Sequence, residues 1–168
     1  LSDKDLMICN AEEPMCIAGV FGGLDSGTTE QTVDVFLESA YFNPTWVRKT
    51  ARRHGLNTDS SFRFERGIDP NGTIYALKEA ALLVQELAGG TISSEIKDNY
   101  PEPIAPFTVE LNYEKAYSLI GKVIPAETIK SIVTSLEMKI VNETPEGLTL
   151  QVPPYRVDVQ RDCDVVED

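Results

Sequence analysis

Short apolar runs at the start of the chain predict a β-hairpin. LMICNA and MCIAGV, at residues 6–11 and 15–20, flank an acidic turn, and apolar runs around a tight polar turn are typical of paired strands. A glycine-rich loop follows. The run TVDVFLESAYF, residues 32–42, then predicts a long and largely buried strand, and TISSEI, residues 91–96, predicts one more.

The first helix is marked at both ends. Asn43 is a predicted N-cap, Pro44 stands at the first helical position, and Gly55 follows the last one, in line with the known preferences of helix ends. His54, the only histidine of the chain, falls in the last turn, where the helix dipole favours a cation. This position predicts a surface histidine at the end of the helix.

A second helix has equally clear limits. Asp69 is its predicted N-cap, Pro70 opens it, and YALKEAALLVQELA places apolar residues at helical spacing before a Gly-Gly pair. Residues 98–106 carry three prolines without apolar periodicity, which predicts a linker. Residues 1–97 and residues 107–168 are therefore predicted as two domains.

The part after the linker has a different order of elements. FTVEL is a predicted strand, YEKAYSLIG a short helix, Pro125 opens a helix through about Leu136, and MKIVNETPEGLTLQV predicts a hairpin. A last helix is predicted from near Asp158 to Asp168. Two short helices followed by a hairpin resemble a winged helix. The predicted fold class is α+β: a mixed β-sheet domain with two flanking helices, followed by a small winged-helix-like α+β domain.

Composition narrows the class of protein. With 42% hydrophobic and 25% charged residues, the chain is typical of a soluble globular protein. No apolar run is long enough to span a membrane, and the first ten residues lack the features of a signal peptide. The three cysteines form no CxxC pair, which argues against zinc and a disulfide framework and favours a reducing cytoplasm. Cys9 and Cys16 are predicted as small buried residues on neighbouring strands.

Charge is unevenly distributed along the chain. The net charge of −12 argues against a broad nucleic-acid surface, because phosphates attract a positive footprint. Between residues 48 and 66, however, six basic residues are opposed only by Asp59 and Glu65. Such a basic island is compatible with local contact to the end of a nucleic acid.

The stretch GLNTDSSFRFERGIDP, residues 55–70, is the most unusual in the chain. It alternates phenylalanines with charges and has two arginines but no lysine. Two interpretations remain open from the residues alone: a solvated strand with pairing charges, or the wall of a polar pocket. Where the charges of this stretch support a pocket, Phe62 and Phe64 are expected to face the core.

Four segments carry a resemblance to a known family. AGVFGG, FLESAYF, RRHGLNTDSSFRFERGIDP and PPYRVDVQRDCDVVED occur in the order and spacing seen in the β subunit of bacterial phenylalanyl-tRNA synthetase, from about Leu6 to Asp168. The resemblance implies an editing domain that is incomplete at its N-terminal end, followed by a winged-helix-like domain that is truncated at its C-terminal end. It also implies part of a cytoplasmic ligase that joins Phe to tRNA(Phe) with ATP, in an α2β2 assembly with an α subunit.

The resemblance implies a site that removes tyrosine from mischarged Tyr-tRNA(Phe). Tyrosine differs from phenylalanine by one hydroxyl group, and a second site that requires this hydroxyl corrects the error. Glu38 matches the family's glutamate that contacts the tyrosine hydroxyl, and Gly22 matches a glycine that lets the backbone approach the substrate. The alternatives are an edge residue that pairs with an arginine for Glu38 and a plain hairpin turn for Gly22.

Four further positions surround the implied pocket. Thr58 matches the family's pocket threonine, and Ser60 stands where alanine is common, so its hydroxyl either bonds to the substrate or caps a turn. The charged residues of the motif, Arg63, Glu65 and Arg66, are interpreted as support for the loop at residues 58–60. An alternative role for the arginines is contact with the phosphate of the terminal adenosine.

No residue is assigned as catalytic. Hydrolysis requires a positioned water and a stabilised oxyanion rather than a side-chain base, and no Ser-His-Asp or Cys-His arrangement is evident. The family's site also uses a histidine that lies upstream of this chain. We therefore expect the chain alone to be poor at hydrolysis and inactive in aminoacylation.

The acidic tail raises the question of a metal ion. Asp164, Glu167 and Asp168 lie three and four residues apart on a predicted helix and share one face, and Mg²⁺ prefers such oxygen ligands. The resemblance implies Mg²⁺ binding by Asp158, Asp164, Glu167 and Asp168 at the junction with the α subunit, and a site that is empty in the isolated chain. Helix capping by Asp158 and solvation of the others is the alternative.

Two rival functions remain beside the editing module. A non-catalytic winged-helix module that binds nucleic acid or a protein partner would require a basic recognition helix, and the best candidate offers only Lys130 and Lys139. Packing against a partner subunit is therefore favoured for this half of the chain. A pure scaffold would leave Glu38 and Thr58 without access to solvent.

Overall fold

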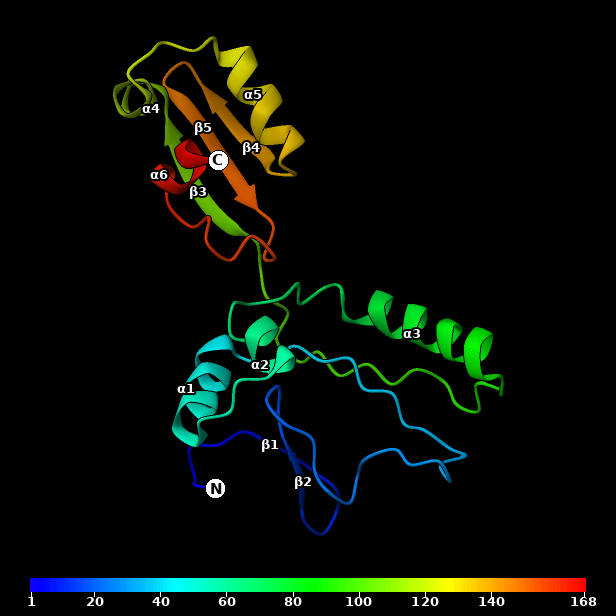
Figure 1. The fold of residues 1–168 in the computed structure, drawn as a ribbon. Helices are drawn as coiled ribbons and strands as arrows, with labels where there is room; N and C mark the ends of the chain where they lie inside the picture. Colours follow the sequence, from blue (N-terminus) through cyan, green and yellow to red (C-terminus); the bar gives the residue numbers. More distant parts are fainter. The chain divides into compact units, whose positions relative to one another are not determined.

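A computed structural model describes residues 1–168 (Figure 1). The chain forms two compact units, Leu1–Asn99 and Tyr100–Asp168, and each combines helices with antiparallel strands. The predicted α+β fold class is confirmed. No helix has both the length and the apolar character that crossing a membrane requires.

The predicted hairpin at the start of the first unit is present. Strand β1 (Met7–Cys9) pairs antiparallel with β2 (Pro14–Ile17), and Met7 lies opposite Ile17. Cys16 is half-buried, but Cys9 is exposed, so the prediction that both thiols are buried is wrong for Cys9. A sheet of two strands has no further strand to cover its edge, which leaves Cys9 open to water.

Helix α1 (Pro44–His54) has the predicted ends. The Asn43 side chain accepts hydrogen bonds from two backbone N–H groups of the first turn, and Gly55 adopts the left-handed conformation with φ 64°. One face of the helix is buried through Val47, Thr50 and Ala51. This face packs in a small core that includes Val20 and the partly buried side chains Ile17, Phe42, Leu56 and Phe64.

The unusual motif forms a helix, so of the two interpretations left open the solvated strand does not hold. Helix α2 (Asp59–Phe64) begins at the N-cap Thr58, whose side chain bonds to the Ser61 N–H while the Ser61 hydroxyl accepts from the Thr58 N–H. This reciprocal capping stabilises a helix start and overrides the alternation in sequence. Phe64 packs against Phe42, with ring centroids 5.0 Å apart, whereas Phe62 is 52% exposed and does not face the core as expected.

Helix α3 (Thr73–Ala88) begins later than predicted. The Asp69 side chain accepts a hydrogen bond from the Asn71 N–H, so Asp69 and Pro70 form a turn before the helix, and Gly72 is the N-cap. None of the residues of α3 is buried. Among its apolar side chains, which carry the predicted helical spacing, Leu82, Leu83 and Leu87 are exposed.

The two other strands predicted for this unit do not form. Residues 32–42 and 91–96 have no regular secondary structure, and Val33 and Phe36 are 91% and 94% exposed. A strand requires a neighbour that pairs with its backbone N–H and C=O groups, and β1 and β2 pair only with each other. Apolar composition alone therefore gave the wrong prediction.

The second unit contains a three-stranded antiparallel sheet in the order β3-β5-β4. Its strands are β3 (Phe107–Asn112), β4 (Lys139–Thr144) and β5 (Gly147–Val152). The central strand β5 supplies the most buried side chains, Leu148, Leu150 and Val152. Helices α4 (Tyr113–Ile120) and α5 (Ala126–Ser135) add Ala116, Ile129 and Val133 to this core. The strands, the first two helices and the hairpin predicted for this part are confirmed.

The last helix, α6 (Asp162–Glu167), is shorter than predicted. Residues 157–161 form a turn and irregular structure instead of helix, and Val159 in this segment is buried in the core together with Val165. Helix α6 lies beside α4 and β3, and α5 lies along β4 (Figure 1).

Candidate functional site

A cavity of about 390 Å³ in the first unit brings together three of the predicted site residues. Gly22, Glu38 and Ser60 line it, although they lie on three separate segments of the chain. Most of its other walls are apolar. They are formed by Ile8, Cys16, Ile17, Gly19, Val20, Phe21, Ser39, Ala40, Phe42, Phe64 and Ile68. A polar floor with apolar and aromatic walls is typical of small-ligand sites.

Glu38 supplies the negative charge of this cavity. Partial burial raises the pKa of its carboxyl above the ordinary 4.5 and is the only cause acting on it. No arginine or lysine forms an ion pair with Glu38, so the alternative interpretation as an edge residue paired with Arg63 or Arg66 has no support in the geometry. Glu38 is an exposed residue of the cavity lining whose carboxyl is only partly desolvated, and no hydrogen bond or ion pair to the protein holds it.

Cys16 lies in the same cavity. Burial raises the pKa of its thiol, and the negative charge of Glu38 raises it further. Since the thiolate is the reactive form of cysteine, both effects keep Cys16 in its unreactive form.

Two neighbouring glycines differ in what constrains them. A Cβ added at Gly23 would lie 1.9 Å from the carbonyl oxygen of Met15, whereas a Cβ at Gly22 would meet no atom within 4 Å. The fold therefore requires glycine at position 23 but not at position 22. Gly22 lines the cavity, which is compatible with close approach of a ligand to its backbone.

Thr58 does not line the cavity but joins two of its walls. Its hydroxyl donates a hydrogen bond to the Val20 carbonyl at 2.6 Å and accepts one from the Ser61 N–H at 3.0 Å. Val20 and α2 both contribute to the cavity lining. This hydroxyl therefore holds the loop after β2 against the start of α2.

The charged residues of the motif act locally on α2. Arg63 donates to the Asp59 carbonyl at 3.2 Å, and Arg66 donates to the Phe62 carbonyl and to Glu65 at 2.7 and 3.2 Å. These bonds stabilise the end of the helix and the turn after it. Their role as support for the pocket stays a prediction.

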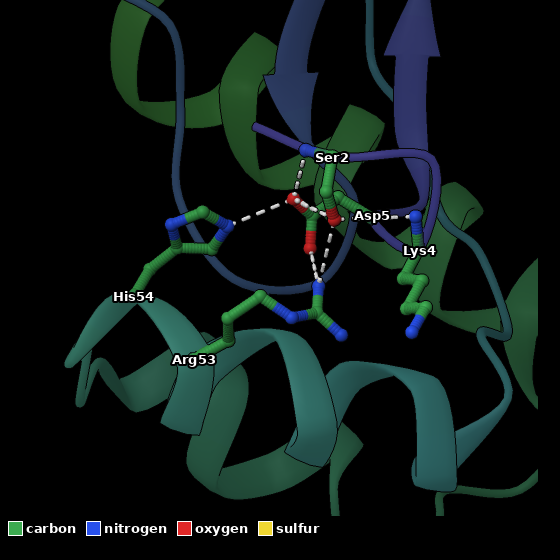
Figure 2. A network of polar contacts seen from close by, with 5 residues as sticks. All are labelled: Ser2, Lys4, Asp5, Arg53 and His54. Carbon is green, nitrogen blue, oxygen red and sulfur yellow. Dashed lines mark hydrogen bonds and ion pairs between the residues drawn. The ribbon is translucent and has the colours of Figure 1, made fainter.

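A second polar network, at the end of α1, has no counterpart in the sequence analysis (Figure 2). Asp5, whose side chain is fully shielded from solvent, pairs with Arg53 and with His54 Nε2, the latter at 2.8 Å. It also accepts from the Ser2 N–H at 2.8 Å. His54 is thus a partner of a shielded carboxylate rather than the surface residue predicted. The sequence held one signal of this network: Arg53 and His54 stand together at a helix end, and an acidic segment stands at the N-terminal end of the chain.

This network predicts a pH-dependent attachment of the N-terminal turn. Burial alone would raise the pKa of Asp5, but hydrogen bonds from His54 and Ser2 and the charge of Arg53 outweigh it, and the pKa is held well below the ordinary 3.8. A carboxylate with a lowered pKa stabilises the fold above its ordinary pKa, and this stabilisation is lost as pH falls through the lowered value. Asp5→Asn is therefore expected to speed amide hydrogen exchange in residues 2–6 at pH 7, and the difference from wild type should shrink below pH 4. Equal exchange rates at pH 7 would contradict this assignment.

Two carboxylates of the acidic tail are paired with arginines rather than gathered around a metal ion. Asp164 is bound by Arg161 at 2.7 Å and Asp168 by Arg156 at 3.1 Å, and hydrogen bonds from Arg161 help to hold the pKa of Asp164 well below its ordinary value. No group of three or more His, Cys, Asp or Glu side chains converges. Asp158, Asp164, Glu167 and Asp168 as arranged here do not fit Mg²⁺.

The fold and the cavity define the class of protein: an α+β protein whose first unit holds a small, mostly apolar ligand cavity with one carboxylate. Residues 1–89 match the family model of the B3/4 domain, and residues 109–168 match that of the tRNA synthetase B5 domain. The chain belongs to the B3/4 domain family.

The chain is also similar to curated proteins over its whole length. Proteins named phenylalanine–tRNA ligase beta subunit from Bacteroides fragilis (strain YCH46), Porphyromonas gingivalis (strain W83) and Desulfotalea psychrophila are 80%, 56% and 42% identical to this chain. Each alignment covers the whole chain but 20%, 20% and 21% of the relative. The chain thus spans about a fifth of the length of the curated relatives it matches. The predicted resemblance is confirmed.

Proposed function

We propose that this chain is the part of a phenylalanine–tRNA ligase β subunit that recognises tyrosine attached to tRNA(Phe), so that the error is hydrolysed. The observation that carries this proposal is the unpaired Glu38 carboxyl in a cavity with aromatic walls. An amino acid with a phenol ring fits both parts of this site. The whole enzyme would join Phe to tRNA(Phe) with ATP in the cytoplasm, together with an α subunit.

Selectivity follows from the carboxylate. The phenol of tyrosine donates a hydrogen bond to Glu38, and a hydrogen bond to a charged group contributes about 1.5–3 kcal/mol. Phenylalanine fills the same apolar walls but leaves the carboxylate desolvated and without a partner. The site thus prefers the larger, wrong amino acid, which an activation pocket for phenylalanine rejects only weakly.

The cavity positions the substrate rather than attacking it. Gly22 offers its backbone without a side chain in the way, Ser60 adds a hydroxyl to the wall, and Thr58 sets the spacing between the loop after β2 and α2. The thiol of Cys16 is kept protonated, which favours attack by a water over a covalent route. The groups that orient that water lie outside this chain in the proposal.

The second unit is proposed as a surface for a partner subunit. The rival proposal, a winged helix that binds nucleic acid, requires free cations on α5. The only cation of α5 is Lys130, and Glu127 and Glu143 bind its Nζ at 2.6 and 2.8 Å, which raises the pKa of Lys130 further above its ordinary value. Its charge is therefore already neutralised. Any Mg²⁺ in the intact enzyme would require a different arrangement of the acidic tail.

The proposal is tested with a variant of the full-length subunit, assembled with its partner, in which a larger side chain fills the cavity. Ser60→Leu adds a branched side chain to the cavity wall, and we expect hydrolysis of Tyr-tRNA(Phe) to fall at least about tenfold, since displacing a bound group by a few ångströms has effects of this size. Aminoacylation with phenylalanine should be unchanged. Asn57→Leu, on an exposed residue outside the cavity lining, serves as the control. Unchanged hydrolysis by the Ser60 variant would reject this cavity as the tyrosine site.

A further inference from the structure

The exposed face of α1 concentrates positive charge. The helix contains four basic residues besides His54 and no acidic one, in a chain with a net charge of −12. At 100° per residue, Arg48, Lys49, Arg52 and Arg53 fall on the face opposite the buried Val47, Thr50 and Ala51. Arg53 is neutralised by Asp5. The three others form no ion pair, and we call Arg48, Lys49 and Arg52 the α1 cationic face.

The fold does not explain this face. Arg48 and Arg52 lie four residues apart, where like charges repel and destabilise a helix. The helix dipole favours cations only in the last turn, which accounts for Arg52 but not for Arg48 or Lys49. Solvation alone would be served as well by residues of mixed charge. The uncompensated charge therefore indicates an anionic partner.

Aromatic side chains accompany the cations. Trp46 is 48% exposed, and Lys49 Nζ lies 6.0 Å from its ring centroid. The guanidinium of Arg66, in the turn after α2, lies 3.6 Å from the ring centroid of the exposed Phe62. Cations interleaved with exposed aromatic rings are typical of surfaces that bind single-stranded nucleic acid, because rings stack on bases while cations contact phosphates.

The opposite face of α1 supports the cavity. Val47 packs with Val20, Phe42 and Phe64, and these three residues line the cavity that contains Glu38. An α-helix is about 10 Å across and its 11 residues extend about 16 Å. A strand that places its terminal adenosine at the cavity therefore has α1 within reach of its preceding phosphates.

We propose that the α1 cationic face binds the backbone phosphates at the 3′ end of the tRNA while the terminal aminoacyl group occupies the cavity. This proposal rests on the proposed function for the identity of the RNA. It gives Arg48, Lys49 and Arg52 a positioning role: they act on the affinity for the tRNA and leave the bond-breaking step unchanged.

The test is the triple variant Arg48→Gln/Lys49→Gln/Arg52→Gln in the full-length, assembled enzyme. Glutamine keeps helix propensity close to that of arginine and lysine. We expect kcat/KM for Tyr-tRNA(Phe) hydrolysis to fall about tenfold, with kcat at saturation unchanged. Each phosphate contact to a single strand contributes about 0.7 to the slope of log affinity against log salt, so the loss of three contacts should reduce the slope by about 2.

Two controls separate this surface from the cavity. Tyrosyl adenosine carries the groups that enter the cavity but no phosphate, and its hydrolysis should be equal in wild type and variant. Lys97→Gln/Lys122→Gln/Lys139→Gln removes the same charge outside α1 and should leave kcat/KM for Tyr-tRNA(Phe) unchanged.

The other possible results either overturn or support the role of the α1 cationic face. Equal kcat/KM and equal salt slopes in wild type and the α1 variant would overturn the proposal, and so would an equal loss on tyrosyl adenosine, which would show that the change acts through the cavity. If the wild type hydrolyses neither substrate, the proposed function fails by itself. Binding of uncharged tRNA(Phe) then decides: a slope reduced by about 2 supports the α1 cationic face, and an unchanged slope rejects it.

Discussion

Glu38→Gln in the intact enzyme is expected to reduce kcat/KM for the hydrolysis of Tyr-tRNA(Phe) about tenfold. The amide has the shape of the carboxyl and still accepts a hydrogen bond, but a neutral acceptor contributes about 1.4 kcal/mol less than a charged one, which corresponds to about one power of ten in rate. Hydrolysis of Phe-tRNA(Phe), which does not use this bond, should change little. The preference for tyrosine should therefore fall by about the same factor.

The pH profile gives the same residue a second readout. The pKa of Glu38 lies above its ordinary 4.5 because of burial, and only the ionised carboxyl is a full acceptor. Hydrolysis of Tyr-tRNA(Phe) by the wild type should therefore decline as pH falls through a value above 4.5, and this decline should be absent from Glu38→Gln. If Glu38→Gln distinguished Tyr-tRNA(Phe) from Phe-tRNA(Phe) as well as the wild type does, Glu38 would be rejected as the group that binds the tyrosine hydroxyl.

Gly23→Ala is expected to disrupt the loop after β2, whereas Gly22→Ala should leave the fold intact. A Cβ at position 23 would overlap the Met15 carbonyl at 1.9 Å, and relief of such overlap within the backbone costs about 3 kcal/mol. Hydrogen exchange at the Phe21 and Ala18 amides, which bond to Ile17 and Leu6, should then be about 100-fold faster.

Gly22→Ala provides the matched control, because its Cβ would meet no protein atom within 4 Å. Its amide exchange should equal that of the wild type. Its hydrolysis of Tyr-tRNA(Phe) should nevertheless fall, since the new methyl group enters the cavity beside the ligand. Normal hydrolysis by this variant would leave Gly22 as an ordinary loop residue, and normal exchange in Gly23→Ala would contradict the packing described here.

Local signals in the sequence predicted those elements whose stabilising groups are close in the chain. The cap at Asn43 and the left-handed Gly55 define α1, and the hairpin of β4 and β5 carries its own turn. The apolar run at residues 32–42 shows the limit of this reasoning. A strand forms only when a second segment pairs with its backbone. No strand of this chain pairs with residues 32–42, and Val33 and Phe36 are exposed.

In the candidate site, too, the sequence indicated some residues and missed others. The motif and the resemblance indicated Gly22, Glu38 and Ser60, which line one cavity. They did not indicate that residues 59–64 form a helix, since the decisive bonds between Thr58 and Ser61 compete with an equally regular alternation of apolar residues. Asp5 was missed because its partners lie 48 and 49 positions away, and pattern alone carries no information on such a distance.

The hydroxyl of Thr58 has a consequence for the motion of the first unit. The Thr58 hydroxyl bonds to both the Val20 carbonyl and the Ser61 N–H, so the loop after β2 can move away from the start of α2 only if the bond to Val20 breaks. Opening the cavity on this side therefore costs one hydrogen bond, about 1 kcal/mol.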